Sequence, residues 1–211
     1  MARAHMIVEG YGELEAAVTL VTKLGSDLGL PFVAWAKPKR GKALNTHAGV
    51  LMACELLRSE RDCSFALLLR DVDDGCPAAL GPETARWVEE AALPFPVAVV
   101  LAQREFEAWF LPCLPRMAGQ ELREGCSLQA GAVFTGDPEG KRDVKGWLSK
   151  HLFPPGKAYK PTLDQNLLTK QIDFAMLREA GVRSFGTLEN ALRFLSAGAG
   201  TVYPPPKTPQ R

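Results

Sequence analysis

Residues 67–75 read Leu67-Leu68-Leu69-Arg70-Asp71-Val72-Asp73-Asp74-Gly75, an apolar run that ends in acidic residues and a glycine. Near-continuous apolar sequence is typical of a parallel strand buried on both faces, so we expect a strand over 64–70. Alternate side chains of a strand share a face, which should bring Asp71 and Asp73 together where this strand ends. An acidic turn explains Asp74-Gly75 but not this alternation. Paired carboxylates at the carboxyl end of a strand suit a divalent cation, and open α/β sheets bind their ligands at that edge.

The sequence on either side alternates strand and helix patterns. Short apolar segments over 4–8, 31–36, 64–70 and 95–102 predict four strands, with helices predicted over 14–24, 46–58 and 79–92. Strands that alternate with helices indicate an α/β fold with a mainly parallel sheet of about four strands flanked by helices.

The C-terminal third differs in composition and in its pattern of apolar residues. Residues 112–138 mix proline, glycine and polar residues, and helical patterns then return over 141–148, 163–170, 173–180 and 184–195. We therefore expect an α/β domain over 1–112, a loop-rich and helical part over 113–200 packed at one end of the sheet, and a proline-rich tail over 201–211 that is extended or disordered.

Composition limits the class of protein. The 211 residues carry a net charge of +1, which neither favours nor excludes a nucleic-acid partner. Five cysteines without metal-ligand spacing are expected to be reduced thiols. The sequence shows no signal peptide and no apolar run of about twenty residues, so we expect a soluble cytoplasmic protein without a membrane partner.

Two further strand ends carry acidic pairs. Glu9 ends the first predicted strand and Glu13 opens the following helix, where the helix dipole alone would also favour a glutamate. After the fourth strand come Glu105 and Glu107, which share a face if the strand continues but not if a helix begins at Glu105. Carboxylates gathered at one edge repel one another unless cations neutralise them, so the three pairs predict a divalent metal site.

Other motifs are less specific. The aromatic residues Phe106, Trp109 and Phe110 have helical spacing and are expected in the core. His47 has no second histidine at metal-ligand spacing and is expected at a helix end or on the surface. Four cations in a segment broken by proline and glycine predict a loop that is either solvated surface or a phosphate-binding element: Lys37, Lys39, Arg40 and Lys42.

Taken together, these motifs resemble the TOPRIM fold, which topoisomerases, primases and OLD-type nucleases share. More narrowly, the chain is similar to a bacterial TOPRIM-like family catalogued as a domain of unknown function. The similarity spans most of residues 4–195. It rests on Val8-Glu9-Gly10, Asp71-x-Asp73 with Cys76-Pro77, Arg104-Glu105-Phe106-Glu107-Ala108-Trp109-Phe110-Leu111, Lys145-Gly146-Trp147-Leu148, and Asp173 with Ser184-Phe185.

The resemblance implies phosphodiester hydrolysis of DNA or RNA that depends on Mg²⁺ or Mn²⁺. It implies that one of Glu105 and Glu107 joins four other metal ligands: Glu9, Glu13, Asp71 and Asp73. Lys145 would be the electrostatic stabiliser, although Lys141 lies nearby. The implied catalytic set is Glu9, Asp71, Asp73 and Lys145.

The resemblance also implies a partner. TOPRIM-like proteins of this kind often act with an ATPase subunit in anti-phage defence, and this chain has no Walker motif of its own. The alternative is a non-catalytic TOPRIM scaffold that binds and regulates a partner ATPase or a nucleic acid. The number of copies that assemble, including a homo-oligomer, stays open.

Overall fold

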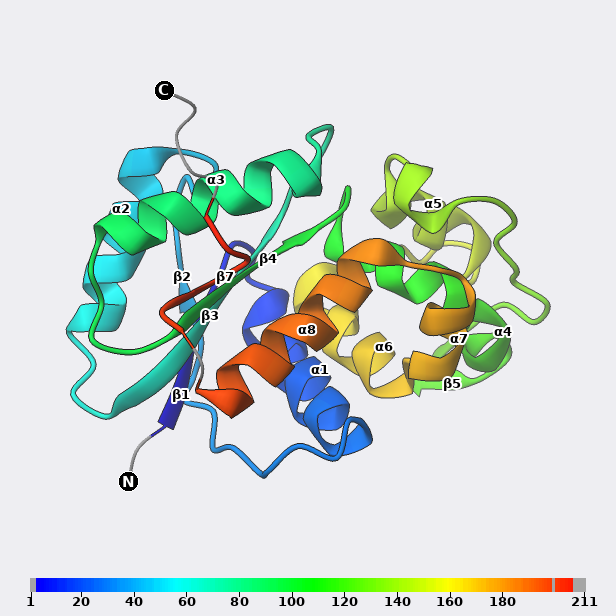
Figure 1. The fold of residues 1–211 in the computed structure, drawn as a ribbon. Coiled ribbons are helices and arrows are strands. Elements are labelled where there is room, and N and C mark those ends of the chain that lie inside the picture. The colour runs from blue at the N-terminus through cyan, green and yellow to red at the C-terminus, as the bar shows by residue number, and fades with distance from the viewer. Residues whose placement is uncertain (1–2, 199, 207–211) are drawn as a thin grey trace.

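The computed structural model describes residues 3–198 and 200–206 of the chain. Its main sheet has five parallel strands in the order β2-β1-β3-β4-β7 (Figure 1). The strands are β1 (Arg3–Val8), β2 (Lys39–Arg40), β3 (Cys63–Asp71), β4 (Val97–Ala102) and β7 (Val202–Tyr203). The predicted α/β fold with a mainly parallel sheet is confirmed, with one strand more than expected.

Helices cover both faces of the sheet. α1 (Glu13–Asp27) and α8 (Arg183–Ala197) lie on one face, and α2 (His47–Arg58) and α3 (Pro77–Glu90) lie on the other (Figure 1). Alternate strand residues feed the two sides: Leu67 and Leu69 belong to the core around α1 and α8, whereas Ala66 and Leu68 pack in the core around α2 and α3. The apolar run therefore forms a doubly buried central strand, as its sequence indicates.

The C-terminal part extends the larger core. It contains the short antiparallel pair β5 (Glu121–Arg123) and β6 (Cys126–Ser127) and a series of short helices. These helices are α4 (Leu114–Met117), η2 (Pro138–Gly140), α5 (Val144–His151), η3 (Pro161–Gln165), α6 (Asn166–Gln171) and α7 (Phe174–Glu179). Helices were predicted near α5, η3, α6, α7 and α8 but not at α4 and η2, and α8 lies against β4 on the sheet face and not only at one end of the sheet.

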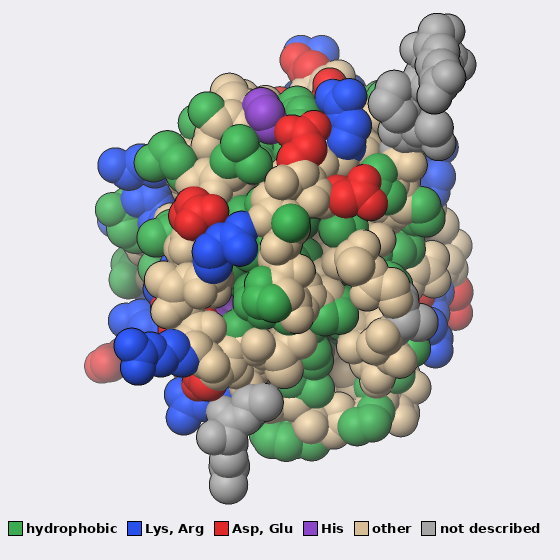
Figure 2. Space-filling model, turned by 60° about the vertical axis from the view of Figure 1, so that its left-hand side comes forward, with side chains coloured by type: hydrophobic (Ala, Val, Ile, Leu, Met, Phe, Trp, Pro, Cys, Tyr) green, Lys and Arg blue, Asp and Glu red, His purple; other side chains and the backbone are tan. Residues whose placement is uncertain are grey.

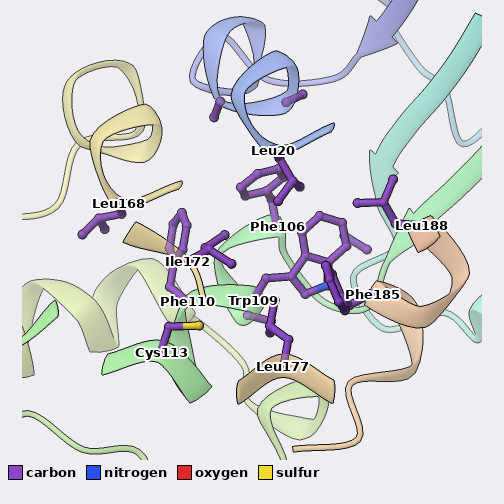
Figure 3. Packing of buried hydrophobic residues seen from close by; sticks show 14 of the residues in the cluster. Leu20, Phe106, Trp109, Phe110, Cys113, Leu168, Ile172, Leu177, Phe185 and Leu188 are labelled. Atoms are coloured by element: carbon purple, nitrogen blue, oxygen red, sulfur yellow. The ribbon is translucent and has the colours of Figure 1, made fainter. Parts of the chain in front are cut away.

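The predicted aromatic core is confirmed. η1, a 3₁₀-helix over Phe106–Cys113, follows β4. Its residues Phe106, Trp109 and Phe110 are at most 1% exposed and pack with side chains from α1, α6, α7 and α8 (Figure 3). Because this helix begins at Phe106, the strand does not continue through the two glutamates, and a helix does not begin at Glu105 either.

The strand predicted over 31–36 is wrong in its position. The chain does pass along β1 there, since Ala36 N donates to Ala4 O at 2.8 Å, but within 31–36 the only residue with a β-bridge is Trp35. Pro38 has no N–H to donate, and regular pairing appears only at Lys39–Arg40, which form β2. Part of the basic segment predicted to be a loop is therefore an edge strand.

Part of the predicted tail belongs to the sheet, since Val202 and Tyr203 pair with Val97 and Ala98 as β7. Residues 207–211 of the predicted tail lie outside the described part. Among the residues that the structure describes, no helix is both long and apolar enough to span a membrane.

Candidate functional site

The carboxyl edge of the sheet holds a cavity of about 430 Å³. It lies at the ends of β1 and β3, the neighbouring strands from which the sheet grows in opposite directions, with β2 beyond β1 and β4 beyond β3. Such a switch point is where open α/β sheets bind ligands. The cavity collects most of the predicted site residues: Glu9, Glu13, Asp71, Asp73, Glu107 and Lys145.

Asp71 is the last residue of β3 and lies among other acidic groups. Its Oδ1 accepts a hydrogen bond from Phe106 N at 2.8 Å, which fixes the carboxylate against the start of η1. Burial, and then the nearby charges of Glu13 and Glu107, raise the pKa of Asp71 well above its ordinary value. The cavity therefore disfavours a negative charge here unless a cation balances it.

Glu9 and Glu13 come from the turn between β1 and α1. Oε2 of Glu13 accepts a hydrogen bond from Glu9 N at 3.1 Å, so this buried glutamate also orders the turn. Burial raises the pKa of Glu13 to about 7, and the charges of Glu107 and Glu9 act in the same direction. Both roles considered for Glu13, helix start and acidic site, thus coincide in one side chain.

Lys145 on α5 brings a cation to these carboxylates. Its Nζ lies 3.2 Å from Glu105 Oε2, 3.1 Å from Glu107 Oε2 and 4.0 Å from Asp71 Oδ2. Burial alone would lower the pKa of Lys145, but Glu107, Asp71 and Glu105 outweigh it and raise that pKa. The ammonium group therefore stays charged among the carboxylates.

The two glutamates after β4 have different places. Glu107 is 1% exposed and lines the cavity, where Tyr159 Oη donates a hydrogen bond to its Oε1 at 2.8 Å. Glu105 reaches the same lysine from the rim and lines a neighbouring small cavity with Asp73 and Arg104. Glu107 is thus the one of the pair inside the main cavity.

Asp73 lines the cavity with Asp71, but not by the strand alternation predicted for it. β3 ends at Asp71, and Asp73 has a φ of 50°, in the left-handed region that an extended strand does not use. Asp73 instead forms an isolated antiparallel bridge with Arg104, which also has a positive φ. A turn, rather than strand alternation, brings this carboxylate to the cavity. Asp74 lies in the turn, as predicted, and pairs with Arg104 and Arg142.

One wall of the cavity had no signal in the sequence. Pro161, Thr162 and Gln165 of η3, a π-helical turn, line it beside the β1–α1 turn. The contact requires glycine at position 12, since a Cβ there would lie 2.8 Å from the backbone carbonyl carbon of Pro161 as well as 2.1 Å from Gln165 Oε1. Tyr159 also went unpredicted. A lone tyrosine in a loop carries no pattern, and only the tertiary fold shows that it contacts Glu107.

The predicted nucleic-acid-binding residues divide into two groups. Lys37 and Lys42 are exposed. Lys39 forms an ion pair with Glu60, and Arg40 donates to Glu9 O at 3.0 Å and stacks on the Tyr11 ring at 3.8 Å. Arg40 thus lies at the edge of the acidic cavity. On the face that Figure 2 shows, basic and acidic side chains are interspersed.

The donor chemistry of the cavity, but not its present spacing, fits a divalent cation. Carboxylate oxygens are the ligands that Mg²⁺ and Mn²⁺ prefer. Among the described residues, however, the group whose ligand atoms all lie within 4.8 Å of one another is His5, Glu60 and Asp62, and not the carboxylates of the cavity. Lys145 lies between Asp71, Glu105 and Glu107 and supplies a counter-charge there.

His47 lies at the start of α2, as expected, with Nε2 2.7 Å from Glu90 Oε2.

Fold and site together define an α/β protein with a mainly parallel five-stranded sheet and an acidic cavity at its carboxyl edge. Residues 8–193 match the model of a family described as "Domain of unknown function (DUF4276)". The chain belongs to this family, since the match covers well over half of its residues. A search of curated proteins found no match.

The raised pKa of Glu13 predicts how stability depends on pH. Because that pKa rises from 4.5 to about 7, the folded protein binds more protons than the unfolded chain between these values. This contribution to stability is complete below pH 4.5 and is lost as the pH rises through 7, a change of up to about 3 kcal/mol. Urea unfolding of Glu13→Gln and the unchanged protein in chelator, at pH 5 and pH 8, measures it. We expect the variant to lose less stability between the two, and parallel losses would contradict the prediction.

Proposed function

We propose that the protein is a divalent-metal-dependent nuclease that hydrolyses phosphodiester bonds at the carboxyl edge of its sheet. One observation carries the proposal: the turn after β1, the end of β3 and the start of η1 place acidic side chains around one cavity, and α5 adds a lysine. A purely structural role explains this poorly, because buried like charges destabilise a fold unless they are paired.

The ligands in this proposal are the carboxylates of the cavity, Glu9, Glu13, Asp71, Asp73 and Glu107. A bound Mg²⁺ or Mn²⁺ would supply charge neutralisation at the phosphate and a water with a lowered pKa. Glu105 would serve from the rim, through its contact with Lys145.

The chain's own residues divide the remaining work. Lys145 stabilises negative charge that develops on the phosphate, which its charged state allows. Tyr159 holds Glu107 by its hydrogen bond, and Phe106 N holds Asp71, so both carboxylates have a fixed orientation. Arg40 lies beside Glu9 and Tyr11, where it can contact the phosphate backbone of a bound strand.

The TOPRIM resemblance further supports the proposal that the protein is an effector subunit in cytoplasmic anti-phage defence and works with an ATPase partner. Five free cysteines agree with a reducing compartment. The second candidate function is a non-catalytic TOPRIM scaffold. The ion pairs of Lys145 with Glu105 and Glu107 favour it, since they neutralise part of the acidic charge at the cavity without a metal.

A direct assay tests the nuclease. Single- and double-stranded DNA and RNA are incubated with the protein in Mn²⁺, Mg²⁺ or chelator, alone and with the ATPase of a neighbouring gene. We expect cleavage of at least one substrate that needs the metal and stops in chelator. Intact substrates in every mixture, with circular dichroism showing folded protein, would contradict the proposal and leave the scaffold.

A further inference from the structure

A second group of metal-ligand side chains lies at the opposite edge of the sheet. It consists of His5 on β1 and of Glu60 and Asp62, which precede β3. Figure 1 shows the amino ends of β1 and β3 side by side, near the N-terminus. Glu9 is four residue steps beyond His5 along extended chain, a distance of about 13 Å, so this group is separate from the acidic cavity.

The spacing of its atoms suits one ion. One ligand atom from each of the three residues lies within 4.8 Å of the others. His5 Nε2 and Asp62 Oδ1 are 3.0 Å apart, somewhat closer than the about 3.4 Å between two ligands of a tetrahedral ion with bonds of about 2.1 Å, so an ion would have to open this contact. His5 is buried, while the carboxylate side chains of Glu60 and Asp62 are 26% and 41% exposed. An ion could therefore enter from the solvent between the carboxylates and reach the imidazole beneath.

The neighbouring cations leave one oxygen of each carboxylate facing the imidazole, that of Asp62 at Nε2 and that of Glu60 at Nδ1, so an ion bound at one ring nitrogen must draw the other carboxylate towards it. Lys39 pairs with Oε1 of Glu60, whereas Oε2 of Glu60 lies 4.0 Å from His5 Nδ1. Arg3 Nε lies 3.7 Å from Oδ2 of Asp62, whereas Oδ1 contacts the imidazole. Outer partners of this kind orient ligating carboxylates in metal sites.

The backbone is held as well. Arg3 N donates to Asp62 O at 2.8 Å, and Ser64 Oγ donates to Arg3 O at 2.9 Å. These bonds fix the segment before β3 to the start of β1. The three side chains are therefore presented by main chain that is already ordered, which lowers the entropy lost on binding.

We propose that His5, Glu60 and Asp62 form a binding site for a divalent transition metal, with Zn²⁺ as the representative ion. Imidazole together with carboxylate oxygens suits Zn²⁺, whereas Mg²⁺ takes oxygen ligands. The site does not depend on the proposed nuclease. Its effect is to link β1, the segment before β3 and, through Lys39, β2.

The competing arrangement contains no metal. A protonated His5 between two carboxylates, each with its own cation, would form an ion-pair network with similar distances. The two arrangements differ in a measurable way, because the ion must displace the hydrogen bond between His5 and Asp62.

Calorimetric titration of the full chain with Zn²⁺, after chelator treatment, tests the site. We expect a saturable Zn²⁺ site, besides any ion that the acidic cavity takes, with affinity at least tenfold weaker in Asp62→Asn, an isosteric change at a partly exposed side chain. In His5→Gln we expect this site's contribution to the binding to disappear. If that variant does not fold, Asp62→Asn decides the result.

Two matched controls define specificity. His47→Gln removes an exposed histidine that also contacts a carboxylate, Glu90, but is not part of such a three-residue group. Asp71→Asn alters the acidic cavity, which the proposed function makes a separate metal site. In both variants the ¹⁵N shifts of the His5 ring should move on addition of Zn²⁺ as they do in the unchanged protein. Lack of saturable binding, equal affinity in Asp62→Asn, unmoved His5 shifts in the unchanged protein, or their loss in either control would overturn the site.

Discussion

Asp71→Asn is expected to lower Mn²⁺-dependent nucleic-acid cleavage by at least about a hundredfold while leaving the protein folded. Asparagine keeps the oxygen that accepts from Phe106 N, so the anchor of the side chain to η1 survives. The change replaces the second carboxylate oxygen with an amide and removes the negative charge. Removing a charge whose ionisation burial opposes will not destabilise the fold, and so loss of activity would report on the site alone.

The matched control lies three residues further on. Asp74→Asn changes the same chemical group, but Asp74 pairs with Arg104 and Arg142 and does not line the main cavity. We expect its cleavage rate to stay within about twofold of the unchanged protein, measured as initial rates under single-turnover conditions. Undiminished cleavage by Asp71→Asn would remove this carboxylate from the mechanism. Undiminished biological activity of both Asp71→Asn and Glu9→Ala would support the scaffold.

Trp109→Ala is expected to lower the free energy of unfolding by about 3–5 kcal/mol. The side chain is fully buried, lies 6.3 Å from the Phe185 ring, and donates from Nε1 to Ser184 Oγ at 2.9 Å. It thus joins η1, which carries Glu107, to the start of α8. Truncation would leave a large cavity and an unpaired hydroxyl between the sheet edge and its covering helix.

Two further variants show whether the loss of stability comes from packing at position 109 or from the loss of any aromatic ring. Trp109→Phe keeps a ring but loses the hydrogen bond to Ser184, and we expect a loss of about 1–2 kcal/mol. Phe32→Ala removes a side chain that is 86% exposed and should change stability by less than about 0.5 kcal/mol. Urea unfolding followed by circular dichroism measures all three. Similar losses for Trp109→Ala and Phe32→Ala would show that this contact does not hold the core together.

Local patterns were enough to predict the frame of the fold. The apolar run ending at Asp71 became the central strand, and the helical spacing of Phe106, Trp109 and Phe110 placed these rings in the core. Both predictions rest on burial, which depends on side-chain type and period more than on distant partners. Acidic residues at strand ends could also be placed at one edge of the sheet, since parallel strands all end at the same edge.

The features that could not be predicted from the sequence depend on turns and on contacts between residues far apart in the chain. Asp73 reaches the cavity through a left-handed turn conformation that strand alternation does not describe. Tyr159 meets Glu107 across 52 positions of sequence. The His5 group escaped notice because Glu60 and Asp62 resemble an ordinary polar loop until β1 is placed beside them.

β7 closes the sheet with a contact between distant parts of the chain. One helix, α3, joins β3 to β4, but Val97 of β4 pairs with Val202, more than one hundred residues later. Until that segment arrives, the valine-rich β4 has an open edge, and an exposed edge of this kind can pair with another chain. Closing so long a loop is also slow, because its entropy is lost before the contacts form. The docking of β7 therefore decides how long this edge of β4 stays open to other chains.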